Sequence, residues 1–318
     1  MNFYLYKSES FDPCRNLAIE ECLLSRAEDA VILYLWQNEH TVVIGKNQNA
    51  VKECRTALLE KEGGRLVRRL SGGGAVYHDL GNLYFTFLMP RSCYDETKQF
   101  SVILEALAVF GIRAQFTGRN DLTVEGRKFS GNAYYKSPKA AYHHGTLLVD
   151  ADLEKMTRYL SPSKGKLTSK GVDSVRSRVV NLKQLCPDIT IDALKQELGK
   201  SFAHLYGPTE ILTLPDADIS ALSEKYRSRE WTFGRHMPFT LLAEDRFPWG
   251  GIRLELRAEK GIITQATVWS DCMDERFPPR LEDALTGCTL NRASLAARIR
   301  EAAPEFCEDL AALIDQIL

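Results

Sequence analysis

One stretch of the sequence decides the fold, and it spans residues 68–79 with the sequence RRLSGGGAVYHD. Its three consecutive glycines, at positions 72–74, are costly to order because glycine loses the most backbone entropy on folding. A common reason to order them is that the backbone approaches a ligand closely and turns its N–H groups toward an anion. The guanidinium groups of Arg68 and Arg69 could grip the same anion. The alternative is a hairpin loop with an excess of glycine.

The segments on either side place this glycine loop (residues 72–74) between two strands. Leu66 and Val67 lead into it, and the apolar-rich run at 82–89 is typical of a strand. We therefore expect the glycine loop on the rim of a pocket.

Further elements are predicted along the whole chain. Asp12 and Pro13 are typical of a helix start and predict a helix over 12–24. Gly111 suits the C-cap of a helix over 95–110. Other expected helices cover 54–62, 152–160, 191–205 and 219–226, with three short ones near the C-terminus. The expected strands cover 31–36, 41–44, 112–116, 122–124, 127–130, 142–149, 251–257 and 262–269. This mixture predicts an α+β fold.

A change of composition divides the chain in two. Residues 227–239 are polar, contain Trp231 and Pro238, and are typical of a linker. We therefore predict one domain over 1–235, with a mixed or antiparallel sheet flanked by helices, and a small α+β domain over 240–318.

The expected hairpin about Glu125-Gly126 carries a lysine. Side chains alternate along a strand, so Lys128 and Ser130 are predicted on one face and Phe129 on the other. If Phe129 faces the core, Lys128 faces the pocket side. The alternative for Lys128 is a solvated surface position.

Two adjacent histidines stand in the expected strand over 142–149. His143 and His144 must point to opposite faces, so both cannot line one site. No third ligand lies at a convincing spacing, which argues against a zinc site.

Composition limits the function classes. The 318 residues carry 41 basic and 42 acidic side chains. The resulting net charge of −1 provides no overall positive field that would attract nucleic acid. No apolar run reaches the roughly 18 residues of a membrane span. The eight cysteines show no metal-like spacing and the N-terminus does not read as a signal peptide. We expect a cytoplasmic protein with free thiols.

A basic segment lies between Lys155 and Lys183, with eight basic residues and a single acid, Asp173. Such a run is often a solvated face, and it could also dock an acidic protein partner. Nucleic acid is the rival explanation, but the segment has few aromatic side chains for stacking.

Four motifs in order resemble those of the lipoate–protein ligases, which are related to biotin–protein ligases and octanoyltransferases. The motifs lie at 68–79, at 118–122 followed by 127–134, at 143–148 and at 169–178. The last third of the chain is similar to the small accessory domain of that family. The resemblance implies a catalytic domain of the biotin/lipoate ligase type followed by this accessory domain.

The resemblance also implies an activity. Such enzymes activate lipoic acid with ATP and Mg²⁺ to lipoyl-AMP, and then transfer the lipoyl group to one lysine of a lipoyl domain. These acceptors belong to 2-oxoacid dehydrogenase complexes and to the glycine-cleavage H protein. A carboxylate that attacks a triphosphate brings like charges together, so fixed cations are needed at the reacting centre.

The motif match assigns residues to this chemistry. Lys128 is the catalytic residue at the carboxylate and α-phosphate. Asp121 orients Lys128 or shares a Mg²⁺ with the phosphates, and His78 and His144 wall the lipoyl pocket. The full set expected to bind ATP or lipoyl-adenylate is Arg69, Ser71, Gly73, Gly74, Ala75, Val76, Tyr77, His78, Asp121 and His144.

Other functions stay open at this point. One is an octanoyl or lipoyl transferase that uses a cysteine nucleophile and no ATP, although none of the three pocket motifs contains cysteine. Another is a non-catalytic protein that binds lipoate or a nucleotide. Biotin–protein ligase lacks support because its glycine- and arginine-rich loop is not found.

Overall fold

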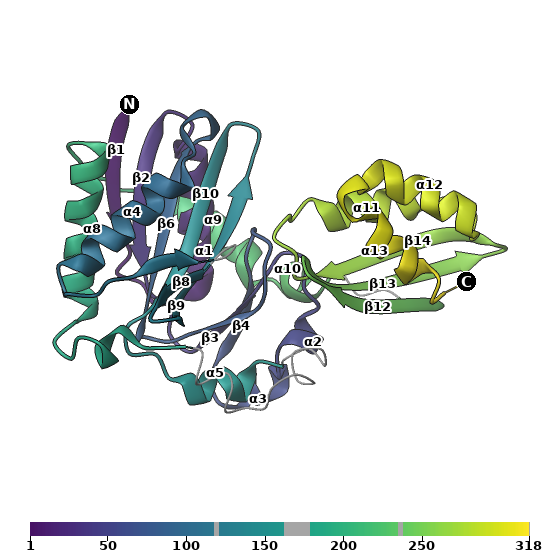
Figure 1. Ribbon diagram of the computed structural model, residues 1–318, viewed down its shortest axis with the longest axis horizontal. Coiled ribbons are helices and arrows are strands. Elements are labelled where there is room, and N and C mark those ends of the chain that lie inside the picture. The colour runs from purple at the N-terminus through teal and green to yellow at the C-terminus, as the bar shows by residue number, and fades with distance from the viewer. Residues whose placement is uncertain (118–120, 162–178, 235–237, 318) are drawn as a thin grey trace. The chain divides into compact units, whose positions relative to one another are not determined.

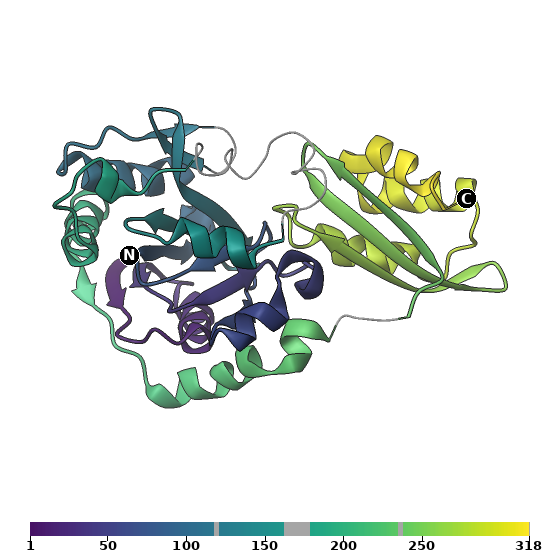
Figure 2. The ribbon, with the colours of Figure 1, turned by 90° about the horizontal axis from the view of Figure 1, so that it is seen from below.

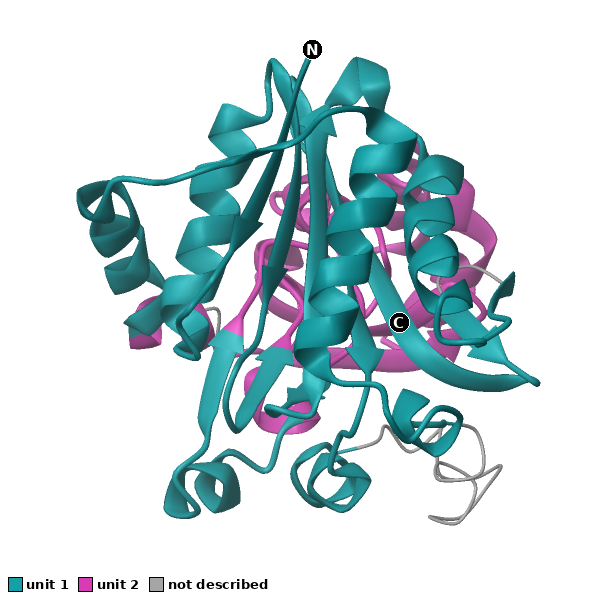
Figure 3. Cartoon of the chain, turned by 90° about the vertical axis from the view of Figure 1, so that its left-hand side faces the viewer, with its two compact units in different colours: residues 1–43, 54–67, 76–228 teal, residues 44–53, 68–75, 229–318 magenta. Residues whose placement is uncertain are grey.

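The structure, a computed structural model, describes residues 1–117, 121–161, 179–234 and 238–317. Part of the second motif, at 118–120, the whole of the fourth motif, at 169–178, and most of the basic segment therefore lie outside the described residues. Contacts group the chain into two compact units, coloured separately in Figure 3. Unit 1 comprises residues 1–43, 54–67 and 76–228, and unit 2 comprises 44–53, 68–75 and 229–318. The division into domains at 235–240 stays a prediction.

Unit 1 is built on an eight-stranded mixed sheet with the strand order β11-β1-β2-β6-β10-β9-β8-β7. Strand β1 pairs in parallel with β2 and β11, and the remaining neighbours are antiparallel. The strands are β1 (Asn2–Lys7), β2 (Ala30–Trp36), β6 (Asn82–Pro90), β7 (Gln115–Thr117), β8 (Asp121–Val124), β9 (Arg127–Lys136), β10 (Ala140–Leu148) and β11 (Glu210–Ile211). The expected mixed sheet is confirmed.

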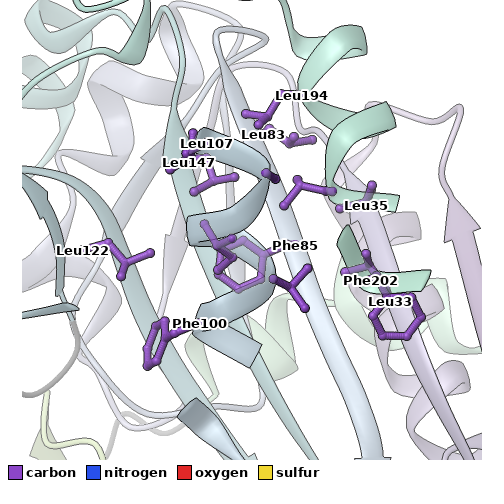
Figure 4. Close-up of a cluster of buried hydrophobic side chains, with 14 of the residues drawn as sticks. Leu33, Leu35, Leu83, Phe85, Phe100, Leu107, Leu122, Leu147, Leu194 and Phe202 are labelled. Atoms are coloured by element: carbon purple, nitrogen blue, oxygen red, sulfur yellow. The ribbon is translucent and has the colours of Figure 1, made fainter. Parts of the chain in front are cut away.

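Helices cover both faces of this sheet (Figure 1). Helices α4 (Glu96–Ala108) and α8 (Ile191–Tyr206) pack on one face, where apolar side chains of both helices and of the sheet form the main core (Figure 4). Helices α1 (Pro13–Arg26) and α9 (Asp216–Arg227) lie on the other face. The smaller elements are α3 (Thr56–Lys61), α5 (Leu153–Tyr159) and the 3-10 turns η1 (Arg91–Cys93) and η2 (Leu182–Gln184).

Local signals set the helix starts. The carboxylate of Asp12 accepts a hydrogen bond from the Cys14 N–H at 3.1 Å, and Pro13 occupies the first turn. Asp95 caps α4 in the same way through the Lys98 N–H. Both predicted helix starts are confirmed.

The β8–β9 hairpin corrects one prediction. Its turn residues Glu125 and Gly126 both have positive φ, at 51° and 75°, as a two-residue hairpin turn requires. A register shift in the hairpin pairs Ser130 with Leu122, and Ser130 is fully buried. The prediction that Ser130 shares a face with Lys128 was therefore wrong, because a β-bulge interrupts the alternation.

A small sheet contains the strands that flank the glycine loop, in the order β4-β3-β5. Its strands are β3 (Thr41–Ile44), β4 (Arg65–Arg68) and β5 (Val76–His78). The glycine loop joins two strands, as predicted, but the second of them is β5, whereas the strand expected at 82–89 is β6 of the large sheet.

Unit 2 contains a three-stranded antiparallel sheet, β12-β13-β14, with three helices packed on one face (Figure 2). Its elements are α2 (Ala50–Glu53), α10 (Arg229–Phe233), β12 (Leu241–Phe247), β13 (Gly250–Glu259), β14 (Ile262–Ser270), α11 (Phe277–Leu285), α12 (Arg292–Ala302), η3 (Pro304–Phe306) and α13 (Cys307–Ile314). The three short helices near the C-terminus are confirmed, whereas the expected linker contains the short helix α10. In the part of the chain that the structure describes, no helix is long and apolar enough to cross a membrane.

Candidate functional site: the glycine loop and the Lys128 hairpin

The three glycines of the glycine loop differ in their surroundings and in their backbone conformation. A Cβ on Gly72 would lie 2.6 Å from the Cys272 carbonyl oxygen, too close for any side chain. Gly73 has a φ of 85° and donates its N–H to the same oxygen at 3.0 Å. A Cβ on Gly74 would meet nothing within 4 Å. Packing within unit 2 thus explains Gly72 and Gly73, and Gly74 faces open space.

Arg68 holds the backbone around the loop. Its guanidinium donates to the carbonyl oxygens of Gly45 (3.1 Å) and Trp231 (3.1 Å), and also to those of Lys46, Gln48 and Thr232. The indole N–H of Trp231 donates back to the Arg68 carbonyl at 2.8 Å. Arg68 is buried and its donors bind these carbonyls, so its contacts in the structure are explained by the backbone that it holds. A contact between Arg68 and an anion stays a prediction.

Arg69 and Ser71 shape the turn itself. The Nε–H of Arg69 donates to Ser71 Oγ at 2.9 Å, and its Nη2 donates to the carbonyls of Gly72 (2.6 Å) and Gly74 (2.8 Å). Both side chains are buried. Because a guanidinium lies against the turn, the glycine loop is locally positive and suits an anionic ligand.

Lys128 lies on β9, on the face opposite the buried Phe129, as predicted. Its Nζ forms an ion pair with Asp121 Oδ1 at 2.7 Å, and both side chains are somewhat over one-third exposed. A Cβ on Gly131 would lie 3.1 Å from this Nζ, so the lysine side chain passes over a glycine. The pair is held in place and remains accessible to a ligand.

The two histidines point to opposite faces, as predicted. His143 lies on the core side, 2.8 Å from Gln99 Oε1 and 2.9 Å from Asn132 Oδ1, and burial lowers its pKa well below the usual range. His144 Nδ1 lies 2.8 Å from Glu20 Oε1. Glu20 also accepts a hydrogen bond from the Thr86 hydroxyl at 2.8 Å.

His78 occupies the end of β5. Its ring stacks on Tyr84 with 3.7 Å between centroids, and its Nδ1 lies 3.1 Å from Asn38 Nδ2. Sequence reasoning missed Asn38 and Glu20. Glu20 had a usable signal, because Glu20 and Glu21 are two charged residues between the apolar runs 17–19 and 22–24 of α1.

The predicted site residues fall in both units. Unit 1 holds Val76, Tyr77, His78, Asp121, Lys128 and His144. Unit 2 holds Arg69, Ser71, Gly73, Gly74 and Ala75. Among the described residues, no group of three or more His, Cys, Asp or Glu could hold a metal ion.

Comparison with known proteins identifies the family. Residues 12–203 match the model of the lipoyl protein ligase A/B catalytic domain, and residues 236–311 match the bacterial lipoate protein ligase C-terminus.

Solved structures agree with this match. LipL1 of P. falciparum in complex with lipoate is 26% identical, with a TM-score of 0.86 over 98% of this chain and 99% of that chain. A bi-partite lipoate protein ligase of Thermoplasma acidophilum, solved with its E2 lipoyl domain, is 26% identical, with a TM-score of 0.65 over 76% and 100%. A lipoate-protein ligase A bound with ATP is 26% identical, with a TM-score of 0.62 over 74% and 99%. Since the catalytic-domain model alone covers more than half of the sequence, the chain belongs to the lipoyl protein ligase A/B family.

Proposed function

We propose that the protein is an ATP-dependent lipoate–protein ligase, which forms lipoyl-AMP and transfers the lipoyl group to a lysine of a lipoyl domain. The observation that carries this proposal is the accessible Lys128–Asp121 pair, 2.7 Å apart, within a family motif. The relatives solved with lipoate and with ATP support the same substrates for this chain.

In the first half-reaction, a carboxylate oxygen of lipoate attacks the α-phosphorus of ATP, an O–P bond forms, and pyrophosphate leaves. Two anions must approach each other, so a fixed cation lowers the barrier most. We assign this role to Lys128. Arg69, Ser71 and residues 73–77 bind the nucleotide, and Gly74 suits close approach because nothing fills the space at its Cα.

Asp121 has two roles in this proposal. It holds Lys128 in position through the ion pair, and it is the carboxylate that would hold Mg²⁺ together with the triphosphate. One or two carboxylates with substrate phosphates and water are the usual Mg²⁺ environment in nucleotide sites. The described residues fit this arrangement, since they offer Asp121 and no closed cage of ligands.

We further propose that His78 and His144 wall the lipoyl pocket. Both belong to aromatic surroundings, with His78 stacked on Tyr84 and His144 4.9 Å from the ring of Tyr142. Such walls suit the apolar chain of lipoate.

The acceptors are lipoyl domains of 2-oxoacid dehydrogenase complexes or the glycine-cleavage H protein. The Thermoplasma acidophilum ligase solved with its E2 lipoyl domain supports this class of partner.

The cysteines argue against the transferase alternative. Burial raises the pKa of Cys14 to about 11, and that of Cys54 and of Cys272 to about 12. A thiol of such high pKa is a poor nucleophile at neutral pH. Cys93 is exposed, and Cys186 and Cys307 are partly exposed, so the burial argument does not cover these three cysteines. Cys93 and Cys186 lie in the catalytic-domain match and are tested first.

The test is incubation of the protein with lipoate, an unmodified lipoyl domain and Mg²⁺, with and without ATP, followed by mass spectrometry of the lipoyl domain. We expect one added lipoyl group in the presence of ATP and none without it. A variant with Cys93→Ser and Cys186→Ser should keep its rate within a few-fold. Transfer without ATP, or a stable acyl–cysteine adduct, would establish the transferase instead.

A further inference from the structure

We propose that Gln48 is a further substrate-binding residue, whose carboxamide NH₂ donates to an anionic oxygen of the substrate at the glycine loop. The inference rests on the proposed function. It assigns a substrate contact to Gln48, which lies outside the four motifs.

The observation behind it is a buried donor without a partner. Gln48 is 1% exposed, its Oε1 accepts the Gly45 N–H at 2.9 Å, and its Nε2 is buried with no hydrogen-bond partner among the described residues. Turning the amide over would not help, because NH₂ would then face the Gly45 N–H. Buried polar groups in folded proteins are almost always paired, so a lone donor needs an explanation.

The position of Gln48 points to the glycine loop. Its partner Gly45 packs on that loop so closely that a Cβ would lie 2.2 Å from the Gly73 carbonyl oxygen. The backbone N–H of Lys46 donates to the Ser71 carbonyl oxygen at 2.9 Å, and the backbone N–H of Arg69 donates to the Ile44 carbonyl oxygen at 3.0 Å. All of these contacts lie within unit 2. The carboxamide of Gln48 is therefore hydrogen-bonded to a residue that packs directly on the loop.

Gln48 is also held rigidly. Its carbonyl accepts a hydrogen bond from Arg68 Nη1 at 2.7 Å, so both its main chain and its side-chain oxygen are fixed. A rigid donor binds with little loss of entropy.

The chemistry of the surroundings selects the acceptor. The unpaired group is a donor, so its partner must present a lone pair, and the guanidinium of Arg69 against the same loop favours an anion. A carboxylate oxygen of the acyl acid and a phosphate oxygen of the nucleotide share this chemistry. The experiment below distinguishes them.

The test compares two amide-to-acid variants. Gln48→Glu keeps the acceptor for Gly45 and replaces NH₂ with a charged oxygen. Asn49→Asp adds the same charge one residue away and keeps the Asn49 Oδ1 atom that accepts from the Val51 and Lys52 N–H groups. Affinity for lipoate alone and for a non-hydrolysable ATP analogue with Mg²⁺ is measured by calorimetry for both variants and the wild type.

We expect Gln48→Glu to weaken one ligand at least tenfold, about 1.4 kcal/mol, while Asn49→Asp stays within about twofold. The ligand that is weakened identifies the oxygen. Unchanged affinity for both ligands in folded Gln48→Glu would overturn the proposal and leave water as the partner of the amide.

If Gln48→Glu does not fold, Gln48→Met removes the donor without adding charge. An affinity loss of about threefold or more would then support the proposal, and an unchanged affinity would overturn it. Pyrophosphate release by the wild type is assayed separately. A wild type that binds both ligands but releases no pyrophosphate refutes the ligase function and leaves the role of Gln48 to be decided by the binding data.

Discussion

At the residue scale, a short ion pair on a hairpin carries the proposed chemistry. Lys128 and Asp121 face each other from paired strands, and Gly131 leaves room for the lysine side chain. Because both side chains remain partly exposed, a substrate can compete with Asp121 for the ammonium group. This exchange of partners is what a catalytic cation requires.

Lys128→Ala should therefore abolish adenylate formation and leave the fold intact. Loss of one fixed cation at developing phosphate charge costs roughly 3–4 kcal/mol, by analogy with loss of an oxyanion donor. The measurement is pyrophosphate release, with circular dichroism to check folding. Arg127→Ala is the matched control, since Arg127 is the adjacent cation and pairs only loosely with Glu125, at 3.7 Å. Equal rates in folded Lys128→Ala and wild type would remove Lys128 from catalysis.

A second prediction at the residue scale concerns His143 and the pH dependence of the protein's stability. Burial lowers its pKa in the folded protein, whereas in the unfolded chain a histidine takes up a proton near pH 6.5. Below that pH the unfolded state binds more protons, so stability falls as pH falls, by up to about 1.4 kcal/mol per unit. Urea unfolding between pH 7.5 and 5.5 measures this slope.

His143→Gln should flatten the slope in that range, whatever its effect on stability at pH 7.5. Identical slopes for the variant and the wild type would show that His143 does not titrate on unfolding.

At the scale of elements, the sequence predicted the helix starts and turns that depend only on neighbouring residues. Asp12 and Pro13 predicted the start of α1, and Glu125-Gly126 predicted the β8–β9 turn. The burial of Ser130 was missed because a bulge is set by the partner strand. Strands β1, β5, β11 and β12 were also missed. Strand β1, for example, depends on parallel pairing with β2, more than twenty residues away.

The glycine loop shows the same limit. Its sequence predicted a special backbone, but the atoms that require Gly72 belong to Cys272 and Met273, about two hundred residues further along the chain. No local pattern reports such a contact. The candidate residues around it were named from the motifs, and their roles stay predictions.

This difference among the glycines can be tested by two matched substitutions. Gly72→Ala places a methyl group against two carbonyl oxygens and should destabilise the protein by about 1–3 kcal/mol in urea unfolding. Gly74→Ala meets open space, so its stability should change by less than about 0.5 kcal/mol while its KM for ATP rises. The opposite ranking of stabilities would contradict the assignment of the two glycines.

At the scale of the whole molecule, the basic segment predicts how the acceptor is recruited. Lys164, Lys166 and Lys170 lie outside the described residues, so this expectation rests on sequence alone. Reversing these three charges to Glu should slow transfer to the lipoyl domain and spare adenylate formation. The effect should shrink as salt rises, because exposed charges are screened over about 8–10 Å.

Single-turnover transfer and pyrophosphate release measure the two half-reactions separately. The control reverses three exposed lysines outside the basic segment, Lys61, Lys139 and Lys200. Equal slowing of both half-reactions by the Lys164, Lys166 and Lys170 variant would point to the nucleotide site.

The glycine loop lies in the first third of the sequence, yet the partners that require Gly72, Cys272 and Met273, come from the last third. If the chain were divided after residue 228, the first polypeptide would keep Gly73 and Arg68 but lose the Cys272 oxygen and the carbonyls of α10. The loop would then become ordered only when the two polypeptides associate, so the concentration of the second polypeptide would set the fraction of active enzyme. Covalent continuity makes the single chain independent of dilution.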